Sequence, residues 1–465
     1  MNNMRHLILL AFTMISVFSY AQPASLRVDL FHTGDAETEI FSLDEVVIEP
    51  LPWPGSESQN LDHLNRGKYR FIVSDSKSKN ILYTRSFSSI YGEWETTGEA
   101  KNIKRTFHES LRFPMPQSEV IVSIEKRDSQ HRFQPLWQTN IDPQHYLHHR
   151  ASAHYKKHVI AIEKNGKPSE KVDLLILGDG YTVNELGKFE ASARNMTEAL
   201  FATSPFKENR QRFNVWALAV PTQQSGVSRP STGEYRDTAL GATYDAFGSE
   251  RYVLTTNNKA FRSIAANAPY EFVEIIVNNK TYGGGGIYGQ YSTAAANSNW
   301  ANYLFIHEFG HHFAGLADEY YTSSVAYGAP QKVLEPYEPN VTALLDGQPL
   351  KWAALVKDGT PLPTPWPKKT YEEQSYKYQK ERAKLRKENK PESEMDKLFH
   401  ENQHRAEALF SKAQHQHDIG AFQGGNYSPV NFYRSEINCL MFTRTEEFCQ
   451  VCQNAIVDMI DLYAK

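Results

Sequence analysis

The pattern of apolar and polar positions divides the chain into regions with two different periods. From residue 22 to about 140, apolar and polar residues alternate in short segments such as SLRVDLF, KYRFIVSD and SEVIVSIEK. Successive side chains of a β-strand point to opposite faces, so this alternation predicts half-buried strands. Turn residues such as Thr33-Gly34 and Pro54-Gly55 separate the segments. We therefore expect an antiparallel β-sandwich domain over residues 22–140.

The second region, from residue 171 onward, has the mixed pattern of an α/β domain. Short, largely apolar runs predict buried strands, and the segments between them have the spacing of amphipathic helices. The expected strands are 172–180, 213–221, 271–279 and 285–295, and the expected helices are 183–204 and 257–267, with a further helix after residue 295. This order predicts a layered α/β (α+β) fold. Residues 141–170 lie between the two regions and are predicted to be a linker.

A highly charged segment interrupts the second region at residues 369–415. It is dense in Lys, Arg and Glu and carries Pro391 near its middle. Proline lacks the amide N–H that a helix interior needs, so we expect two helices that meet at Pro391. Segments with this density of mixed charges usually face solvent, which favours a solvated helical insertion. A coiled-coil surface for a partner is the alternative interpretation.

The first 21 residues have the parts of a secretory signal peptide. Arg5 and His6 precede an apolar run from about Leu7 to Phe18, and small residues lie three and one positions before the Ala21–Gln22 bond. This run is short for a bilayer span, and no later run is long and apolar enough, so we expect no membrane-spanning segment. The pattern predicts cleavage after Ala21 and export to the periplasm or the extracellular space.

Composition and charge limit the classes of partner. Apolar residues make up 40% of the 465 residues, charged residues make up 22%, and the formal net charge is −4. Nucleic-acid binding requires a clustered basic surface, so nucleic acid is not expected as a partner. The three cysteines, Cys439, Cys449 and Cys452, lie near the C-terminus. In an exported protein they predict one disulfide that ties Cys439 to the C-terminal segment, with one free thiol; a Cys449–Cys452 redox pair is the alternative.

The segment LFIHEFGHHFAGLADEY at residues 304–320 contains the strongest chemical motif. His307 and His311 are four residues apart, so on a helix they lie on one face and can bind one zinc ion together. Glu308 then lies beside the metal, where it can take a proton from a water molecule. Two satisfied core histidines would be the simpler structural alternative.

A catalytic zinc usually has three protein ligands and one open position, so a third ligand is required. Gly315 can end the helix and turn the chain. Asp318 follows and is the expected third ligand, with Glu319 as the alternative. His312 points about 100° around the helix from His311 and is not expected to bind the same ion.

Several segments together resemble the IgA-peptidase family of bacterial zinc metallopeptidases, a metzincin-like group. They are HEFGHHFAGLADEY, VDLLILGDGYT, FNVWALAVPTQQSGV, RDTALGATY, GAFQGGNY and YRSEINCLMFT…FCQVC, and the resemblance covers roughly residues 170–465 with an upstream β domain. It implies that His307, His311 and Asp318 bind one catalytic Zn²⁺ and that Glu308 is catalytic. It also implies that Met441 lies beneath the zinc site; from the sequence alone, Met441 would be an ordinary core residue. The charged insertion departs from the compact family pattern.

Two further roles are weaker predictions. Tyr427 and Tyr433 precede the methionine segment and could stabilise an oxyanion, although packing is an equal alternative for both. An extended substrate could pair with a sheet edge. The residues proposed for that edge are Gly286, Ile287, Tyr288 and Gly289.

The sequence thus predicts a multidomain protein. An N-terminal antiparallel β-sandwich precedes a metzincin-like zincin domain at 171–465, which contains the charged insertion. The predicted function is that of a secreted zinc-dependent endopeptidase acting on a protein or peptide substrate. Two alternatives are a binding or adhesion protein with an inactive zincin body, which the intact Glu308 disfavours, and a zinc amidase acting on peptidoglycan or small peptides. The sequence fixes neither the substrate nor the oligomeric state.

Overall fold

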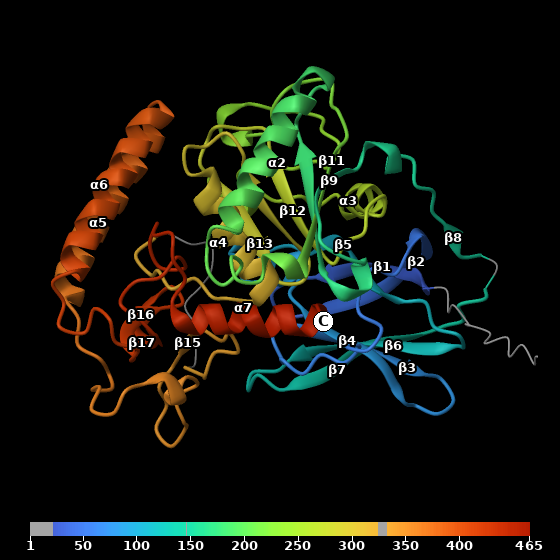
Figure 1. The fold of residues 1–465 in the computed structure, drawn as a ribbon, viewed down its shortest axis with the longest axis horizontal. Helices are drawn as coiled ribbons and strands as arrows, with labels where there is room; N and C mark the ends of the chain where they lie inside the picture. The colour runs from blue at the N-terminus through green and yellow to red at the C-terminus, as the bar shows by residue number, and fades with distance from the viewer. Residues whose placement is uncertain (1–21, 146, 324–332) are drawn as a thin grey trace, which may run out of the picture.

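The computed structural model of the chain describes residues 22–145, 147–323 and 333–465. Two β-sheet bodies lie against each other, and a long helical hairpin lies on the side opposite the N-terminal sheets (Figure 1). The predicted signal peptide covers residues 1–21 and therefore falls outside the described residues. Within the described ranges, none of the helices has the length and apolar character needed to cross a bilayer.

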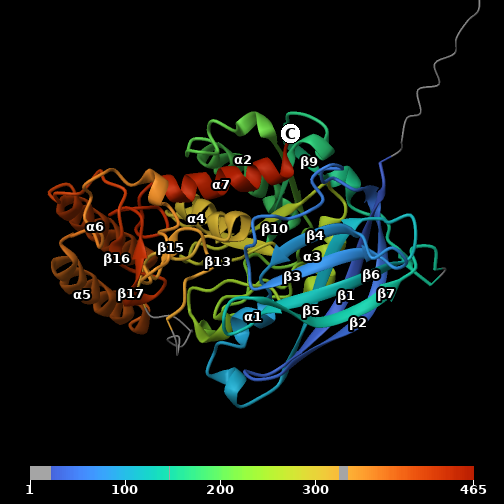
Figure 2. The ribbon, with the colours of Figure 1, turned by 90° about the horizontal axis from the view of Figure 1, so that it is seen from below.

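The N-terminal body consists of two four-stranded sheets that share one buried core (Figure 2). The strand orders are β5-β1-β2-β8 and β4-β3-β6-β7. The strands are β1 (Ala24–Gly34), β2 (Glu39–Pro52), β3 (Tyr69–Asp75), β4 (Ile81–Phe87), β5 (Arg105–Pro114), β6 (Val120–Arg127), β7 (Phe133–Ile141) and β8 (His149–Arg150), with a short helix α1 (Ile90–Trp94). Every second residue of β1 and β6, such as Val28 and Val122, enters the core. This accounts for the period of two in the sequence.

The second body is built on a six-stranded sheet with the order β13-β14-β12-β10-β11-β9. The four central strands are parallel, and the edge strands β13 and β9 run antiparallel to their neighbours. The strands are β9 (Ile160–Lys164), β10 (Val172–Asp179), β11 (Phe213–Ala219), β12 (Phe272–Val277), β13 (Gly284–Ile287) and β14 (Tyr291–Ala295). Every residue of β10 and β12 is buried, as their largely apolar sequences predicted.

Two parts of this sheet differ from the sequence prediction. The single strand expected at 285–295 is a hairpin of β13 and β14, because a turn at residues 288–290 reverses the chain. Gly289 in that turn has a φ of 70°, which glycine adopts without a steric penalty. Strand β9 lies within the segment expected to be a linker and pairs with the free edge of β11.

Helices α2 (Leu186–Leu200) and α4 (Ala301–Ala314) pack beside each other on one face of the six-stranded sheet. Helix α3 (Asn258–Ala265) contacts β5 of the N-terminal body. The C-terminal helix α7 (Gln450–Tyr463) packs against α4. The positions of α2, α3 and α4 confirm the helices expected from the sequence. The layered α/β pattern of this body is therefore present.

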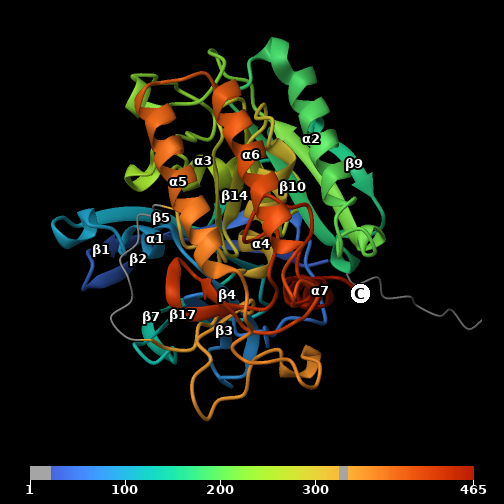
Figure 3. The same cartoon turned by 90° about the vertical axis from the view of Figure 1, so that its left-hand side faces the viewer.

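The charged insertion forms two antiparallel helices, α5 (Lys368–Lys387) and α6 (Glu392–Phe410), on either side of Pro391 (Figure 3). The expectation of a solvated insertion is only partly met, because one face is buried. Tyr371 and Phe410 pack against the ring of Phe442. A small sheet with the order β15-β17-β16 lies beside the hairpin and contains β15 (Val341–Thr342), β16 (Phe422–Gly425) and β17 (Ser428–Arg434).

Candidate active site

Helix α4 holds two histidines at the wall of a cavity. Its apolar residues Phe305, Phe309 and Phe313 are fully buried, which fixes the helix in the core. His307 and His311 lie one turn apart and both line the cavity. The helix ends at Gly315, whose φ of 60° lies in the left-handed region that glycine favours.

Asp318 returns to the two histidines after the turn at Gly315. Its Oδ1 atom lies 3.1 Å from His307 Nε2 and 3.2 Å from His311 Nε2. The two Nε2 atoms are 3.3 Å apart. The three side-chain atoms therefore form a nearly equilateral triangle, contributed by one helix and the loop that follows it.

This triangle has the dimensions of three ligands on one zinc ion. Tetrahedral zinc with ligand bonds of about 2.0–2.1 Å separates neighbouring ligand atoms by about 3.4 Å. His307 Nδ1 donates to the Leu440 carbonyl at 3.1 Å, and His311 Nδ1 donates to the Leu316 carbonyl at 2.6 Å. With the proton on Nδ1 in each neutral ring, both Nε2 atoms present lone pairs toward the Asp318 carboxylate. Three converging acceptors fit a cation.

Asp318 is itself held by a second group. Its Oδ2 atom accepts a hydrogen bond of 2.5 Å from the Tyr427 hydroxyl. Burial raises the pKa of Asp318, but His311 and His307, when they are protonated, outweigh burial and hold the pKa well below its usual value. A carboxylate in this state is ready to bind a metal ion.

Tyr427 reaches Asp318 because of an unusual turn between β16 and β17. Asn426 and Tyr427 have φ values of 46° and 61°, the left-handed conformation that a type I′ hairpin turn requires at both positions. The turn is also fixed by backbone bonds, from Asn426 N to the Asp318 carbonyl and from Tyr427 N to the Tyr320 carbonyl. Strained residues of this kind persist where the surrounding structure holds them.

Glu308 lies beside the three grouped residues and lines the same cavity. Removal from water raises its pKa, while His307 and His311 act in the opposite direction when they are protonated. Strand β13 passes close to it, since a Cβ placed on Gly284 would lie 3.0 Å from Glu308 Cγ. Glu308 is thus positioned next to the predicted metal ligands, where it can exchange a proton with a bound molecule.

The cavity has a volume of about 870 Å³, and several parts of the chain form its walls. Strand β13 and helix α4 form the wall that carries the histidines. The N-terminal body contributes residues such as Lys68 and Arg127, and the insertion contributes residues such as Tyr378 and Arg382. A space of this size can enclose part of a peptide chain.

The other residues that the sequence analysis discussed lie at different distances from the cavity. The Sδ atom of Met441 lies beneath α4, 3.2 Å from the position of a Cβ on Gly310. Tyr433 lies on β17 and is not among the residues that line the cavity. His312 is buried on the opposite side of α4, where it accepts from Val273 N and donates to the Ile287 carbonyl. Burial lowers the pKa of His312 to about 3, so it is neutral and joins α4 to the sheet.

Only half of the predicted substrate edge belongs to a strand. Gly286 and Ile287 end β13, the edge strand, and line the cavity. Tyr288 and Gly289 are in the turn, where the Tyr288 carbonyl accepts from Ser88 N and Gly289 N donates to the His312 carbonyl. These backbone groups are therefore already paired.

Three cavity residues were missed by the sequence analysis. Tyr303 lies one turn before His307, with its hydroxyl 3.3 Å from His307 Nδ1. Arg251 donates to the Tyr320 hydroxyl at 3.0 Å, and both side chains line the cavity. The helical spacing of four could have revealed Tyr303. No sequence pattern could have revealed Arg251, because it comes from a loop between elements.

Two family models match the chain, and together they span most of it. The first, described as IgA Peptidase M64, matches residues 160–460, which is more than half of the chain. The second, described as Peptidase M64 N-terminus, matches residues 17–138. A search among curated proteins gives no match.

These matches define the class of the protein as a metallopeptidase, which hydrolyses peptide bonds with the help of a metal ion. The chain belongs to the IgA peptidase M64 family, as its motifs predicted. Its substrate is therefore a protein or a peptide.

Proposed function

We propose that the chain is a secreted zinc-dependent endopeptidase in which His307, His311 and Asp318 bind one zinc ion and Glu308 is the general base. One observation carries this proposal: the triangle of two imidazole nitrogens and one carboxylate oxygen, with sides of 3.1–3.3 Å. Nitrogen and oxygen ligands at this spacing suit Zn²⁺, and three protein ligands leave a fourth position open for a catalytic role.

The residues around His307, His311 and Asp318 have different roles in the proposed peptide hydrolysis. When bound, the zinc ion polarises the scissile carbonyl and lowers the pKa of a water molecule. Glu308 takes a proton from that water and then passes it to the leaving amine. The Leu440 and Leu316 carbonyls hold the two imidazoles in the orientation that presents Nε2, and Tyr427 holds Asp318. Arg251 and Tyr320 face the same cavity and could stabilise developing negative charge.

We also propose finer assignments for the fold and the location. The two sheets of residues 24–150 share one core, which supports a β-sandwich. The buried Met441 under the histidine helix supports a metzincin-like zincin. Residues 1–21 support secretion with cleavage after Ala21. N-terminal sequencing of the exported protein should give Gln22 as the first residue.

The proposal is tested by zinc analysis and a screen of protein substrates with wild type, Glu308→Ala and Asp318→Ala. Glu308→Ala should retain zinc and lose cleavage by at least about a hundredfold, since a positioned general base contributes about 10²–10⁴-fold. Asp318→Ala should lose the zinc ion held by the histidines, and cleavage with it. Unchanged cleavage in Glu308→Ala would refute the mechanism, and unchanged zinc in Asp318→Ala would refute the ligand assignment. Cleavage of peptidoglycan peptides without any cleavage of proteins would favour the amidase.

A further inference from the structure

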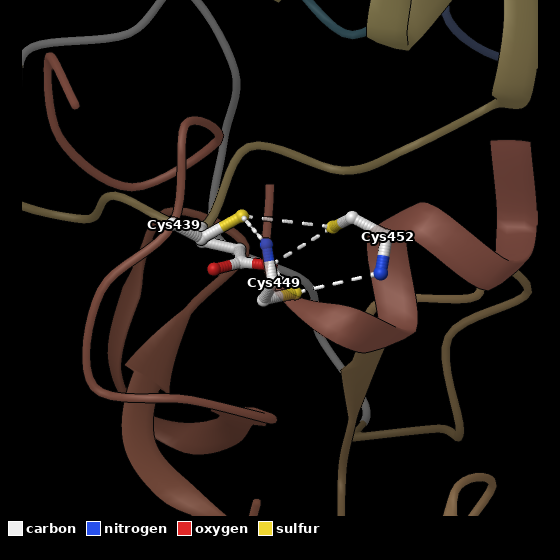
Figure 4. Close-up of side chains that lie close together, drawn as sticks. Cys439, Cys449 and Cys452 are labelled. Atoms are coloured by element: carbon white, nitrogen blue, oxygen red, sulfur yellow. Dashed lines mark hydrogen bonds between the residues drawn. The ribbon is translucent and has the colours of Figure 1, made fainter. Parts of the chain in front are cut away.

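A second group of metal-binding residues lies behind the site just described. Cys439 comes from the loop before Met441, and Cys449 and Cys452 come from the first turn of α7 (Figure 4). Glu319, the residue after Asp318, completes the group. Each of the four residues is at most 3% exposed, and one ligand atom of each lies within 4.8 Å of the others.

The three cysteines were expected to form one disulfide and one free thiol, but the structure has all three as free thiols. Cys439 Sγ and Cys452 Sγ are 3.7 Å apart, whereas a disulfide bond is about 2.05 Å long. Tetrahedral zinc with Zn–S bonds of about 2.3 Å separates two thiolate sulfurs by about 3.8 Å. The observed separation therefore fits two ligands on one metal ion.

Glu319 fits the same geometry. Its Oε1 atom lies 3.5 Å from Cys452 Sγ and 3.9 Å from Cys449 Sγ. With a Zn–O bond of about 2.0 Å, a tetrahedral site places oxygen and sulfur about 3.5 Å apart. Asn340 donates to Oε1, and the buried Oε2 atom has no hydrogen-bond partner among the described residues. A buried carboxylate with an unpaired oxygen requires a cation or a proton.

We propose that Cys439, Cys449, Cys452 and Glu319 form a second, structural zinc site. Thiolates are the ligands that zinc prefers in structural sites, and four protein ligands leave no open position for water. The spacing of Cys449 and Cys452 is the C-x-x-C spacing that recurs in such sites. This site is separate from the proposed catalytic site, because it shares no ligand with it.

Backbone and hydroxyl donors surround the sulfur atoms in the way that thiolate ligands require. Cys439 Sγ accepts from Cys449 N at 3.3 Å and from Met441 N at 3.5 Å. Cys449 Sγ accepts from Cys452 N at 3.4 Å and from the Ser435 hydroxyl at 3.3 Å. Cys449 is also the N-cap of α7, where the helix dipole favours negative charge. These contacts stabilise ionised sulfur.

The position of this site gives it a role in catalysis at a distance. Glu319 is adjacent to Asp318, and its amide donates to the Met441 carbonyl at 2.9 Å. Leu440, between Cys439 and Met441, provides the carbonyl that orients His307. A metal ion at the cysteines would therefore fix both the loop that carries Asp318 and the loop that orients His307. The cysteines and Glu319 are positioning residues in this proposal.

The proposed site is tested by measuring the zinc content of protein that has been purified without any chelator. Wild type should hold about two zinc ions per chain. The double variant His307→Ala/His311→Ala should retain about one zinc ion. Cys439→Ser should lose one zinc ion, and its affinity for the zinc ion at the histidines should fall about tenfold. With cobalt in place of zinc, the double histidine variant should show the near-ultraviolet charge-transfer absorption of thiolate ligands, and the further change Cys452→Ser should remove it.

The counts separate this proposal from the proposed function. If the double histidine variant holds no zinc and no thiolate absorption with cobalt, the second site is refuted while the catalytic site stands. If the double variant and wild type hold the same single zinc, the second site stands and the catalytic assignment fails.

A measurement on wild type alone covers the case in which the cysteine variants do not fold. Alkylation of the denatured, unreduced protein should label three thiols, and alkylation of the native protein should become much faster after chelation. Labelling of only one thiol would show a disulfide and overturn the proposal. Three thiols whose reactivity does not change with chelation would overturn it as well.

Discussion

At the scale of single residues, the atoms that hold the proposed ligands matter as much as the ligands. His307 and His311 expose Nε2 because two carbonyls accept from their Nδ1 atoms. Asp318 presents Oδ1 because the Tyr427 hydroxyl occupies Oδ2. Groups that orient metal ligands in this way usually change metal affinity by about 10–100-fold when they are removed.

We therefore predict that Tyr427→Phe weakens zinc binding about tenfold while the overall fold is kept. The substitution removes the hydroxyl that donates to Asp318 and leaves the ring in place. Competition with a chelator of known affinity measures the effect. Tyr433→Phe is the matched control, because Tyr433 does not line the cavity. Equal zinc affinities for the two variants would contradict the orienting role of Tyr427.

A second prediction concerns Asp173, a buried residue of β10 far from the motif. It accepts hydrogen bonds from Asn214 Nδ2 and Trp216 Nε1 at 3.1 and 2.7 Å. Burial raises its pKa to about 7, although the two hydrogen bonds act in the opposite direction. Because the folded-state pKa exceeds the unfolded value of about 3.9, the protonated form stabilises the fold below about pH 4. That contribution is lost as the pH rises through about 7.

Relative to Asp173→Asn, the wild-type free energy of unfolding should therefore fall between about pH 4 and 7, by at most about 1.4 kcal/mol per pH unit. Denaturant titrations at a series of pH values measure this difference. Asp358→Asn, a change at an exposed residue, should leave the slope as it is in wild type. Parallel curves for wild type and Asp173→Asn would rule out the buried, protonated carboxyl.

At the scale of elements, the sequence predicts those whose burial is simple. Strands β10 and β12 are buried on both faces, and their sequences are correspondingly apolar apart from Asp173, Asp179 and Glu274. Pro391 separates α5 from α6 as proline chemistry requires. The β13–β14 hairpin was missed because Tyr288 continues the apolar pattern through the turn. The turn depends on the positive φ of Gly289. A single glycine in a strand pattern can also indicate a bulge or a close backbone approach, so it does not by itself predict a turn.

The contact between β13 and α4 gives a prediction about packing. A Cβ on Gly286 would lie 2.4 Å from the Glu308 carbonyl oxygen and 2.8 Å from His311 Cβ. Gly286→Ala should therefore lower the free energy of unfolding by about 2 kcal/mol, the cost of overpacking a filled site. It should also reduce peptidase activity, because it pushes on Glu308 and His311. Denaturant titration and a peptidase assay measure the two effects.

Gly187→Ala is the matched control for this change. Gly187 lies in α2, and a Cβ there would meet no atom within 4 Å. Alanine is the better helix former, so this variant should be as stable as wild type or more stable by up to about 1 kcal/mol. If both alanine variants behave alike, close approach of β13 is not important.

At the scale of the whole molecule, the N-terminal sheets are docked against the helix that carries the histidines. Arg66 is 4% exposed, and its Nη1 atom donates to the Ala314 carbonyl at the end of α4 and to the Ala455 carbonyl of α7. Arg112 donates to the Tyr270 carbonyl and lies over the Tyr270 ring at 3.6 Å. The N-terminal body also forms part of the cavity wall.

Arg66→Ala should destabilise the protein by about 2 kcal/mol, because it removes a buried donor that bonds to two main-chain carbonyls. Denaturant titration followed by tryptophan fluorescence measures the loss. Arg132→Ala removes an arginine that is 66% exposed and paired with Asp128, and should cost less than about 1 kcal/mol. A cost for Arg66→Ala as small as that for Arg132→Ala would show that docking does not depend on this residue.

The candidate site shows where prediction from the sequence ends. His307, Glu308 and His311 are grouped by helical geometry, and Asp318 follows seven residues after His311. Local sequence rules are therefore enough to predict that these residues lie together. The partners of Glu319 are Cys439, Cys449 and Cys452, more than 100 residues away. No local period brings those segments together. The sequence leaves Glu319 as an alternative to Asp318, and the tertiary fold groups Glu319 with the cysteines instead.

The hydrogen bond from His307 to Leu440 joins residues 133 positions apart, and this has a consequence for how the enzyme is made. A ribosome releases the histidine helix long before it releases Tyr427, Leu440 and the cysteines. Until those residues emerge, His307 lacks its carbonyl and Asp318 lacks its hydroxyl donor. We therefore expect a partly synthesised chain to be inert. If His307 and Asp318 hold the metal as proposed, we expect proteolytic activity to begin only when nearly the whole polypeptide has been made.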